Sequence, residues 1–187
     1  VSVFRDGQFN MYGGTITNNK AATGGGVYVA DHATVTIGGV SITNKEAAEG
    51  GGMTVGNCQG TLSGTVTITG NKSAGVAGEA SSNLYIKGGK IVVLNDSLDS
   101  NSQVVFKDCD NQYDGTDYIS NVNALDNTKL RCFTTDAGKQ FVKAKDNNVY
   151  VATVLKDDQK PTVQENLVYD GTKQTGVTVP GGADTYY

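Results

Sequence analysis

The sequence predicts an all-β fold, a parallel β-helix in which about 26 residues form each coil of three short strands. Three observations lead to this prediction: clustered glycines, an internal repeat of constant length, and alternating β-branched residues within the repeat. The 187 residues include 25 glycines, 2 prolines and no tryptophan. Because the glycines gather between segments rich in Val, Ile and Thr, they indicate turns between strands and not a flexible linker.

The internal repeat is visible in two similar segments. Residues 13–29 read GGTITNNKAATGGGVYV, and residues 39–55 read GVSITNKEAAEGGGMTV. A third copy continues as TITGNKS, and equivalent isoleucines recur at intervals of 26 residues: Ile16, Ile42 and Ile68. After the third copy the spacing stretches by five residues, so that residues 84–86 take the place of residues 53–55. In the other direction, Val1 and Val3 precede Val27 and Val29 by the same interval, so the repeat begins at the first residue.

Each repeat contains three short segments with β-branched residues at alternate positions, such as Val27–Val29, Thr34–Ile37 and Ser41–Thr43. Three strands that recur at a fixed period predict one triangular coil, in which each strand pairs in parallel with its copy in the next coil. An antiparallel sandwich is the alternative. Its hairpins would not require equal spacing, and the hairpin signals Asn-Gly and Asp-Gly are nearly absent from the repeats.

Stacked coils place equivalent residues in ladders. The inward ladders predicted from the repeat are Ile16, Ile42, Ile68 and Val29, Val55, Ile86. One outward ladder, Lys20, Glu46 and Lys72, places opposite charges on coils about 4.8 Å apart. Asparagines gather at one corner, at Asn18, Asn19, Asn44 and Asn71. We expect an internal ladder that satisfies the turn backbone there, with polysaccharide contact as the alternative.

The pattern TITNN(K)A…GGGVYV resembles the repeats of large secreted surface proteins of Gram-positive, often gut-dwelling, bacteria. The resemblance implies a right-handed parallel β-helix over residues 1–94. Residues 95–157 depart from the pattern and are expected to form irregular terminal coils and a cap, because a solenoid needs an atypical final unit. Strands are predicted there at Gln103–Phe106, Tyr118–Val122, Leu130–Thr134, Gln140–Lys143 and Val149–Leu155.

Residues 158–187 change character again. They contain Pro161, a turn at Val168–Gly171 and a predicted strand at Gly176–Val179. This segment is similar to the opening strands of the small Ig-like modules of bacterial surface proteins, so we expect a linker and the truncated start of such a module. The edge at Val1 lacks a cap pattern, from which we expect further coils before it.

Composition excludes several classes of function. The net charge of −4 gives no electrostatic footprint for nucleic acid or anionic lipid, and no apolar run is long enough to span a membrane. Cys58, Cys109 and Cys132 lack the spacing of a zinc site, and pairing of Cys109 with Cys132 is left open. The single histidine, His32, lies in a turn-like stretch and is expected to be solvent-exposed.

Other β-helix proteins cleave polysaccharides, which requires carboxylates and basic residues aligned across coils. The repeats offer no pair of carboxylates in one register, so no catalytic residue and no cofactor are assigned. The densest acidic segment supplies a weak candidate calcium site at Asp108, Asp110, Asp114 and Asp117, although a solvated loop is the more common explanation. The glycine triplets lack the residues of a phosphate-binding loop and are expected to form tight corners.

The sequence therefore predicts a non-enzymatic structural or adhesive segment of a large bacterial surface protein, located outside the cell. Its expected partners are host glycans or extracellular matrix and the adjoining domains of the same parent chain. The alternative is a carbohydrate-active β-helix whose catalytic coils lie outside this segment. Binding to ice or another repetitive surface is a third hypothesis, but the outward threonines form only a partial array.

Overall fold

The computed structural model describes residues 1–74, 81–87, 90–107, 119–120, 125–143, 149–153, 162–163 and 177–178. The chain divides into two compact units, Val1–Ala152 and Thr153–Tyr187. In the second unit, β17 (Thr162–Val163) pairs antiparallel with β18 (Val177–Thr178), which lies within the predicted strand at 176–179. Pro161 and the turn at 168–171 lie outside the described residues, and the Ig-like assignment stays a prediction.

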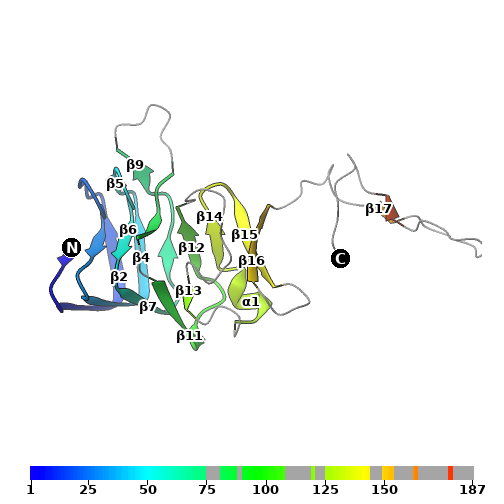
Figure 1. Ribbon diagram of the computed structural model, residues 1–187, viewed down its shortest axis with the longest axis horizontal. Helices are drawn as coiled ribbons and strands as arrows, with labels where there is room; N and C mark the ends of the chain where they lie inside the picture. The colour runs from blue at the N-terminus through cyan, green and yellow to red at the C-terminus, as the bar shows by residue number, and fades with distance from the viewer. Residues whose placement is uncertain are drawn as a thin grey trace, which may run out of the picture. The chain divides into compact units, whose positions relative to one another are not determined.

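The first unit is a parallel β-solenoid of about four turns (Figure 1). Its first ladder stacks β1 (Ser2–Val3), β3 (Val27–Val29), β6 (Met53–Gly56) and β10 (Leu84–Lys87) in parallel. The second stacks the first halves of β2 (Gln8–Thr17) and β4 (Thr34–Thr43) with β7 (Gln59–Gly64), β11 (Lys90–Leu98) and β13 (Ile119–Ser120). The third stacks the second halves of β2 and β4 with β8 (Thr67–Ile68), β12 (Gln103–Phe106) and β14 (Phe133–Thr135). The predicted all-β parallel fold is confirmed.

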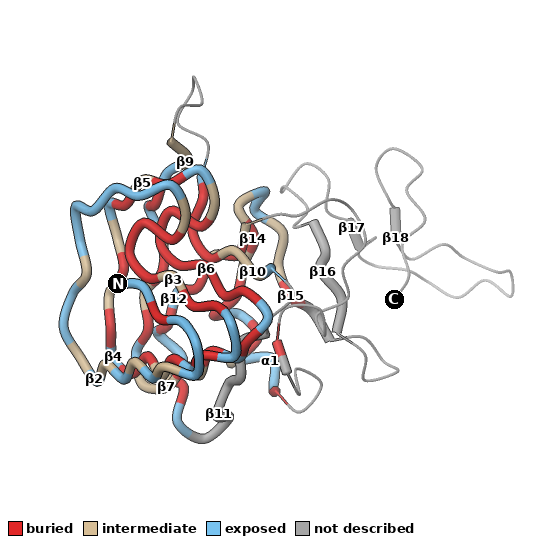
Figure 2. Tube along the Cα trace, turned by 60° about the vertical axis from the view of Figure 1, so that its left-hand side comes forward, coloured by how far each residue is buried: buried red, intermediate tan, exposed pale blue. Residues whose placement is uncertain are grey.

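The registers follow the repeat. Ile16 pairs with Ile42 and Ile42 with Ile68, and this ladder continues through Val104 to Phe133. The second predicted ladder, Val29, Val55 and Ile86, is also in register and begins at Val3. The five-residue stretch is confirmed too, because Leu84 pairs with Met53. Most of these inward residues belong to one buried cluster, against which the partly buried Ile16 and Ile86 pack. Figure 2 shows the buried residues in red inside the coils.

Two of the predicted strands are joined. The segments Thr34–Ile37 and Ser41–Thr43 form the single strand β4, because the backbone bends at Gly39 (φ +63°) without leaving the hydrogen-bonded ladder. A left-handed residue is needed at this corner, and glycine takes that conformation without steric cost. The preceding coil uses Gly13 (φ +119°) at the equivalent position. The separate strands expected from the sequence were therefore wrong at this corner.

The corner between the first and second ladders uses residues other than glycine. Asp31 and His32 have φ values of +55° and +63°, and the amide of Ala33 donates to the carbonyl of Ala30 over 3.1 Å. Positive φ at both central positions, with this hydrogen bond, is typical of a type I′ turn. Here the turn joins strands of one coil and not the strands of a hairpin.

A side arm projects from the third ladder in the first coils. We call residues 18–26, 44–52, 70–74 and 81–83 the arm; they include β5 (Glu46–Ala47) and β9 (Lys72–Ser73), which pair in parallel. Successive coils approach closely there: a Cβ atom on Gly51 would lie 2.5 Å from the carbonyl oxygen of Lys72. Glycine at the corner itself is confirmed at Gly24 and Gly50, whose φ values are +58° and +55°.

The next coil omits the arm. Within β12, Val104 pairs with Ile68 of the third ladder, and Phe106 pairs with Leu84 of the first ladder. This strand therefore passes from the third ladder to the first with a single residue between them. Its one intervening residue replaces the 15 residues from 69 to 83 of the previous coil. Consequently no further glycine triplet is required, and residues 81–83 carry side chains where the earlier coil has Gly50–Gly52.

Parallel stacking ends at β14, which pairs antiparallel with β15 (Lys139–Lys143), itself paired with β16 (Val149–Thr153). The predicted strand Leu130–Thr134 was partly wrong: residues 127–130 form the short helix α1 (Asn127–Leu130), capped by the side chain of Asp126, which accepts from the amide of Lys129. The other predicted strands of this region correspond to β12, β13, β15 and β16. Phe141 of β15 packs with Phe106 and Phe133, with ring centroids 5.6 to 6.1 Å apart.

Candidate functional site

The described residues contain no group of three or more His, Cys, Asp or Glu side chains placed to hold a metal ion. The weak calcium candidates Asp108, Asp110, Asp114 and Asp117 lie outside the described residues. His32 is exposed in its turn, as expected. Among the described helices, none is long and apolar enough to cross a membrane.

Two of the cysteines are buried free thiols, Cys58 and Cys132. The Sγ atom of Cys58 lies 3.4 Å from the carbonyl oxygen of Val29, inside the core. Burial raises the pKa of both thiols, so the reactive thiolate is disfavoured at neutral pH. Cys109 lies outside the described residues. Because Cys58 and Cys132 are buried, we interpret both as residues that pack the core.

The interior of the arm is polar. Asn71 is buried, and its Oδ1 accepts from the amide of Lys45 over 3.1 Å. Its Nδ2 donates to the carbonyl oxygens of Ile42 and Thr69, each over 3.0 Å, and its amide donates to Oδ1 of Asn83 over 2.9 Å. Asn71 therefore satisfies backbone groups across coils, as the internal-ladder prediction required.

The other predicted members of the asparagine ladder do not point inward. Asn18 and Asn44 are exposed and take positive φ values of 57° and 56° at the start of the arm, a conformation that asparagine tolerates. Asn19, in the register of Asn71, is exposed as well. The prediction holds for Asn71 and was wrong for these three, because the coil position of an asparagine does not say whether a neighbouring coil covers it.

Between Asn19 and Asn71 lies Lys45, a charged residue inside the arm. Its side chain is only 1% exposed, and its Nζ donates to the carbonyl oxygen of Thr43 over 3.1 Å. Burial lowers the pKa of this amine, because an ammonium group loses hydration there. This burial could not be predicted from the sequence, since the same register holds two polar asparagines.

At the far end of the arm, Asp136 connects the cap to the last arm residues. Its Oδ1 accepts from Oγ of Ser81 over 2.7 Å and from Nδ2 of Asn83 over 2.8 Å. Its Oδ2 is buried without a hydrogen-bond partner. Burial raises the pKa of this carboxyl, more than its hydrogen bonds lower it. These contacts fasten the cap to the arm.

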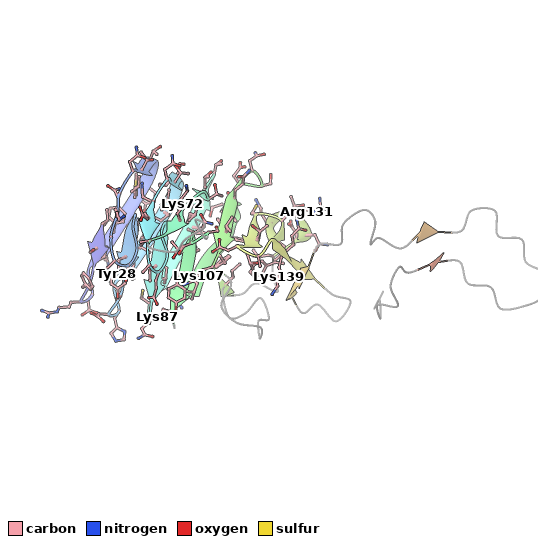
Figure 3. All side chains as sticks on the ribbon, turned by 90° about the horizontal axis from the view of Figure 1, so that it is seen from above. Tyr28, Lys72, Lys87, Lys107, Arg131 and Lys139 are labelled. Atoms are coloured by element: carbon pink, nitrogen blue, oxygen red, sulfur yellow. The ribbon has the colours of Figure 1, made fainter. Side chains whose placement is uncertain are left out.

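A row of aromatic and cationic side chains crosses the outward side of the first ladder. Tyr28, Thr54 and Tyr85 occupy one register, and the amide of Lys107 donates to the carbonyl of Leu84, which places Lys107 next to Tyr85. The Nζ of Lys107 lies 4.7 Å from the centroid of the Tyr85 ring. We call Tyr28, Tyr85, Lys87 and Lys107 the tyrosine–lysine strip. Figure 3 shows Tyr28, Lys87 and Lys107 on the same side of the solenoid, with Lys72 of the arm away from them.

Thr54 lies between the two tyrosines in this register. In the structure its side chain is 0% exposed, and its Oγ1 donates to the carbonyl oxygen of Glu49 over 3.3 Å. Thr54 therefore lies under the surface between its two neighbours. The tyrosines are two coils apart, roughly 9.6 Å at the usual spacing of strands. Phe4 extends the row at the other end, with its ring centroid 5.3 Å from that of Tyr28.

The chain matches no family model, no curated protein and no solved structure.

Proposed function

We propose that this chain is a non-enzymatic structural and adhesive segment of a large extracellular protein of the bacterial surface. The single observation that carries the proposal is the continuous in-register stack from β1 to β14, in which each coil is hydrogen-bonded to the next. Each coil adds about 4.8 Å along the stack, so the segment acts as a stiff spacer. Its resemblance to repeats of Gram-positive surface proteins favours a location at the cell wall.

The distribution of charge along the stack supports the same proposal. A polysaccharide-cleaving site needs an acid and a base held across neighbouring coils. The described outward ladders instead place opposite charges together, as between Lys20 and Glu46, whose Nζ and Oε1 atoms lie 2.7 Å apart. Such exposed pairs are worth about 0 to 1 kcal/mol each, so they favour the register more than they add stability.

The proposal is tested by incubating the purified chain with arrays of host glycans and matrix proteins, and in parallel with pectin, alginate and host glycans in depolymerisation assays. We expect binding without shortening of any polysaccharide. Shortening of a polysaccharide would contradict the proposal and favour the carbohydrate-active alternative.

A further inference from the structure

We propose that the contact between Asp136 and the last arm residues is a pH-sensitive latch, which holds more firmly in acid than at neutral pH. This inference goes beyond the proposed function, because it concerns how the cap is held and not what the surface binds. Asp136 lies in the turn that joins β14 to β15. Its amide donates to the carbonyl oxygen of Phe106 over 2.7 Å, which fixes the turn to the preceding coil.

The side chain of Asp136 covers arm residues that no further arm covers. In the earlier coils each arm is hydrogen-bonded to the arm of the next coil, but the coil of β12 has no arm. Residues 81–83 meet the Asp136 carboxyl instead: its Oδ1 accepts from Oγ of Ser81 over 2.7 Å and from Nδ2 of Asn83 over 2.8 Å. Because Asn83 is buried, its amide group needs such partners inside the protein.

The second carboxyl oxygen of Asp136, Oδ2, makes this contact depend on protonation. It is buried and has no hydrogen-bond partner. A charged oxygen in such a position is costly, whereas a neutral hydroxyl group without a partner costs less. Burial raises the pKa of the carboxyl and outweighs the hydrogen bonds from Ser81 and Asn83, which lower it. Protonation at Oδ2 removes the buried charge and leaves both hydrogen bonds at Oδ1 in place.

Two lysines come from the elements packed against the turn: Lys107, directly after β12, and Lys139, at the start of β15. Lys107 lies over the Tyr85 ring, and its charge lowers the pKa of the Asp136 carboxyl by less than burial raises it. Residues 81–83 carry no charge. In the open latch the carboxyl regains water and its ordinary pKa of 3.8. Since the closed latch binds the proton more tightly, the contact is strongest below pH 3.8 and weakens as the pH rises through the pKa of the folded chain.

The test compares urea denaturation of the whole chain and of Asp136→Asn between about pH 4 and about pH 7. Asparagine keeps an oxygen that accepts from Ser81 and Asn83, but it does not titrate in this range. We expect the parent chain to lose stability relative to Asp136→Asn as the pH rises, with an unfolding equilibrium constant that changes by at most about tenfold per pH unit. A constant difference between the two chains, or a change in the opposite direction, would overturn the latch.

Two further variants and a direct titration sharpen the test. Asp31→Asn replaces an exposed carboxylate at positive φ, which asparagine tolerates, and should keep the pH dependence of the parent. Ser81→Ala removes, at an exposed position, a hydrogen bond that lowers the pKa of Asp136, so it should move the pH dependence to higher pH. An NMR titration of the Asp136 carboxyl carbon in the parent chain measures this pKa whether or not Asp136→Asn folds. A carboxyl that titrates at or below pH 3.8 would overturn the latch.

Discussion

The repeated coils and the terminal coils of this solenoid pack against their neighbours in different ways. In the repeated coils, backbone lies directly against backbone in the arm, and a Cβ atom on Gly25 would lie 2.3 Å from the carbonyl oxygen of Gly51. In the terminal coils the arm is absent, and large side chains pack against one another in the core: Phe106 contacts Phe133 and Phe141. Asn83, which takes the place of Gly52 in the last coil of the arm, accepts a hydrogen bond from the amide of Asn71 through its Oδ1.

Side chains are excluded where one coil of the arm lies against the next, and they are needed where the stack ends. A coil that must receive another coil on its arm requires glycine at the closest approach. A coil with no arm above it can carry larger residues, and its apolar end must be covered by them. The change from Gly50–Gly52 to residues 81–83 therefore marks the end of the arm in the sequence itself.

The largest effect is expected at the terminal coils. Phe106→Ala should lower the free energy of unfolding by about 4 kcal/mol, because a fully buried ring and its contacts with Phe133 and Phe141 are lost. Denaturation by urea measures this change. Phe4→Ala is the matched control, since Phe4 is 46% exposed, and should cost less than about 1 kcal/mol. Equal losses in the two variants would contradict the assignment of Phe106 to the core of the cap.

An intermediate effect is expected in the arm. Gly51→Ala should lower the free energy of unfolding by about 3 kcal/mol, because its Cβ would lie 2.5 Å from the carbonyl oxygen of Lys72 and 2.6 Å from that of Ser82. Gly56→Ala is the control. Its Cβ would meet no atom closer than 3.6 Å, so this variant should be neutral or slightly stabilised. Similar melting temperatures for the two variants would show that the arm coils do not approach as closely as described.

The smallest effect is a gain in stability at Lys45. Lys45→Met should raise the free energy of unfolding by about 1 kcal/mol at neutral pH, because it removes a buried amine whose hydration is lost. Lys20→Met, at an exposed position, is the control.

The same residue predicts a dependence on pH. Burial lowers the pKa of Lys45 below its ordinary value of 10.5, so the unfolded chain binds this proton more tightly than the folded chain. The contribution of Lys45 to stability should therefore rise with pH between its folded pKa and 10.5. Urea denaturation at several pH values should show this rise in the parent chain relative to Lys45→Met. A constant difference between the two would mean that the amine is hydrated in the folded chain.

Much of the stacking could be predicted from the sequence, because a residue that points inward in one coil must do so in the next. Ile16, Ile42 and Ile68 reveal this periodicity directly, and their pairing followed. The burial of Lys45 and Thr54 could not be predicted, since both depend on which neighbouring side chains and coils cover them. The helix at Asn127–Leu130 was also missed, and its last residue, Leu130, was assigned to the strand that contains Phe133.

Only part of the tyrosine–lysine strip could be predicted from the sequence. The shared register of Tyr28 and Tyr85 follows from the repeat, but Lys107 lies beyond the regular copies, where one coil drops its arm. Its position over the Tyr85 ring depends on that shortened coil. A signal existed in the sequence: the segment Gln103–Phe106 is the first strand after the repeats that alternates like the earlier ones.

Successive coils stack in parallel in the register set by the repeat, and disulfide formation between neighbouring coils tests this stacking. With the three native cysteines replaced by alanine, Thr36→Cys and Thr61→Cys place two thiols at directly paired positions, about 4.8 Å apart between Cα atoms. Thr36→Cys with Thr67→Cys is the control, because Thr67 pairs with Ser41 in the third ladder. Under mild oxidation we expect rapid closure of the first pair and none of the second. Closure of the second pair and not the first would contradict the stacked register.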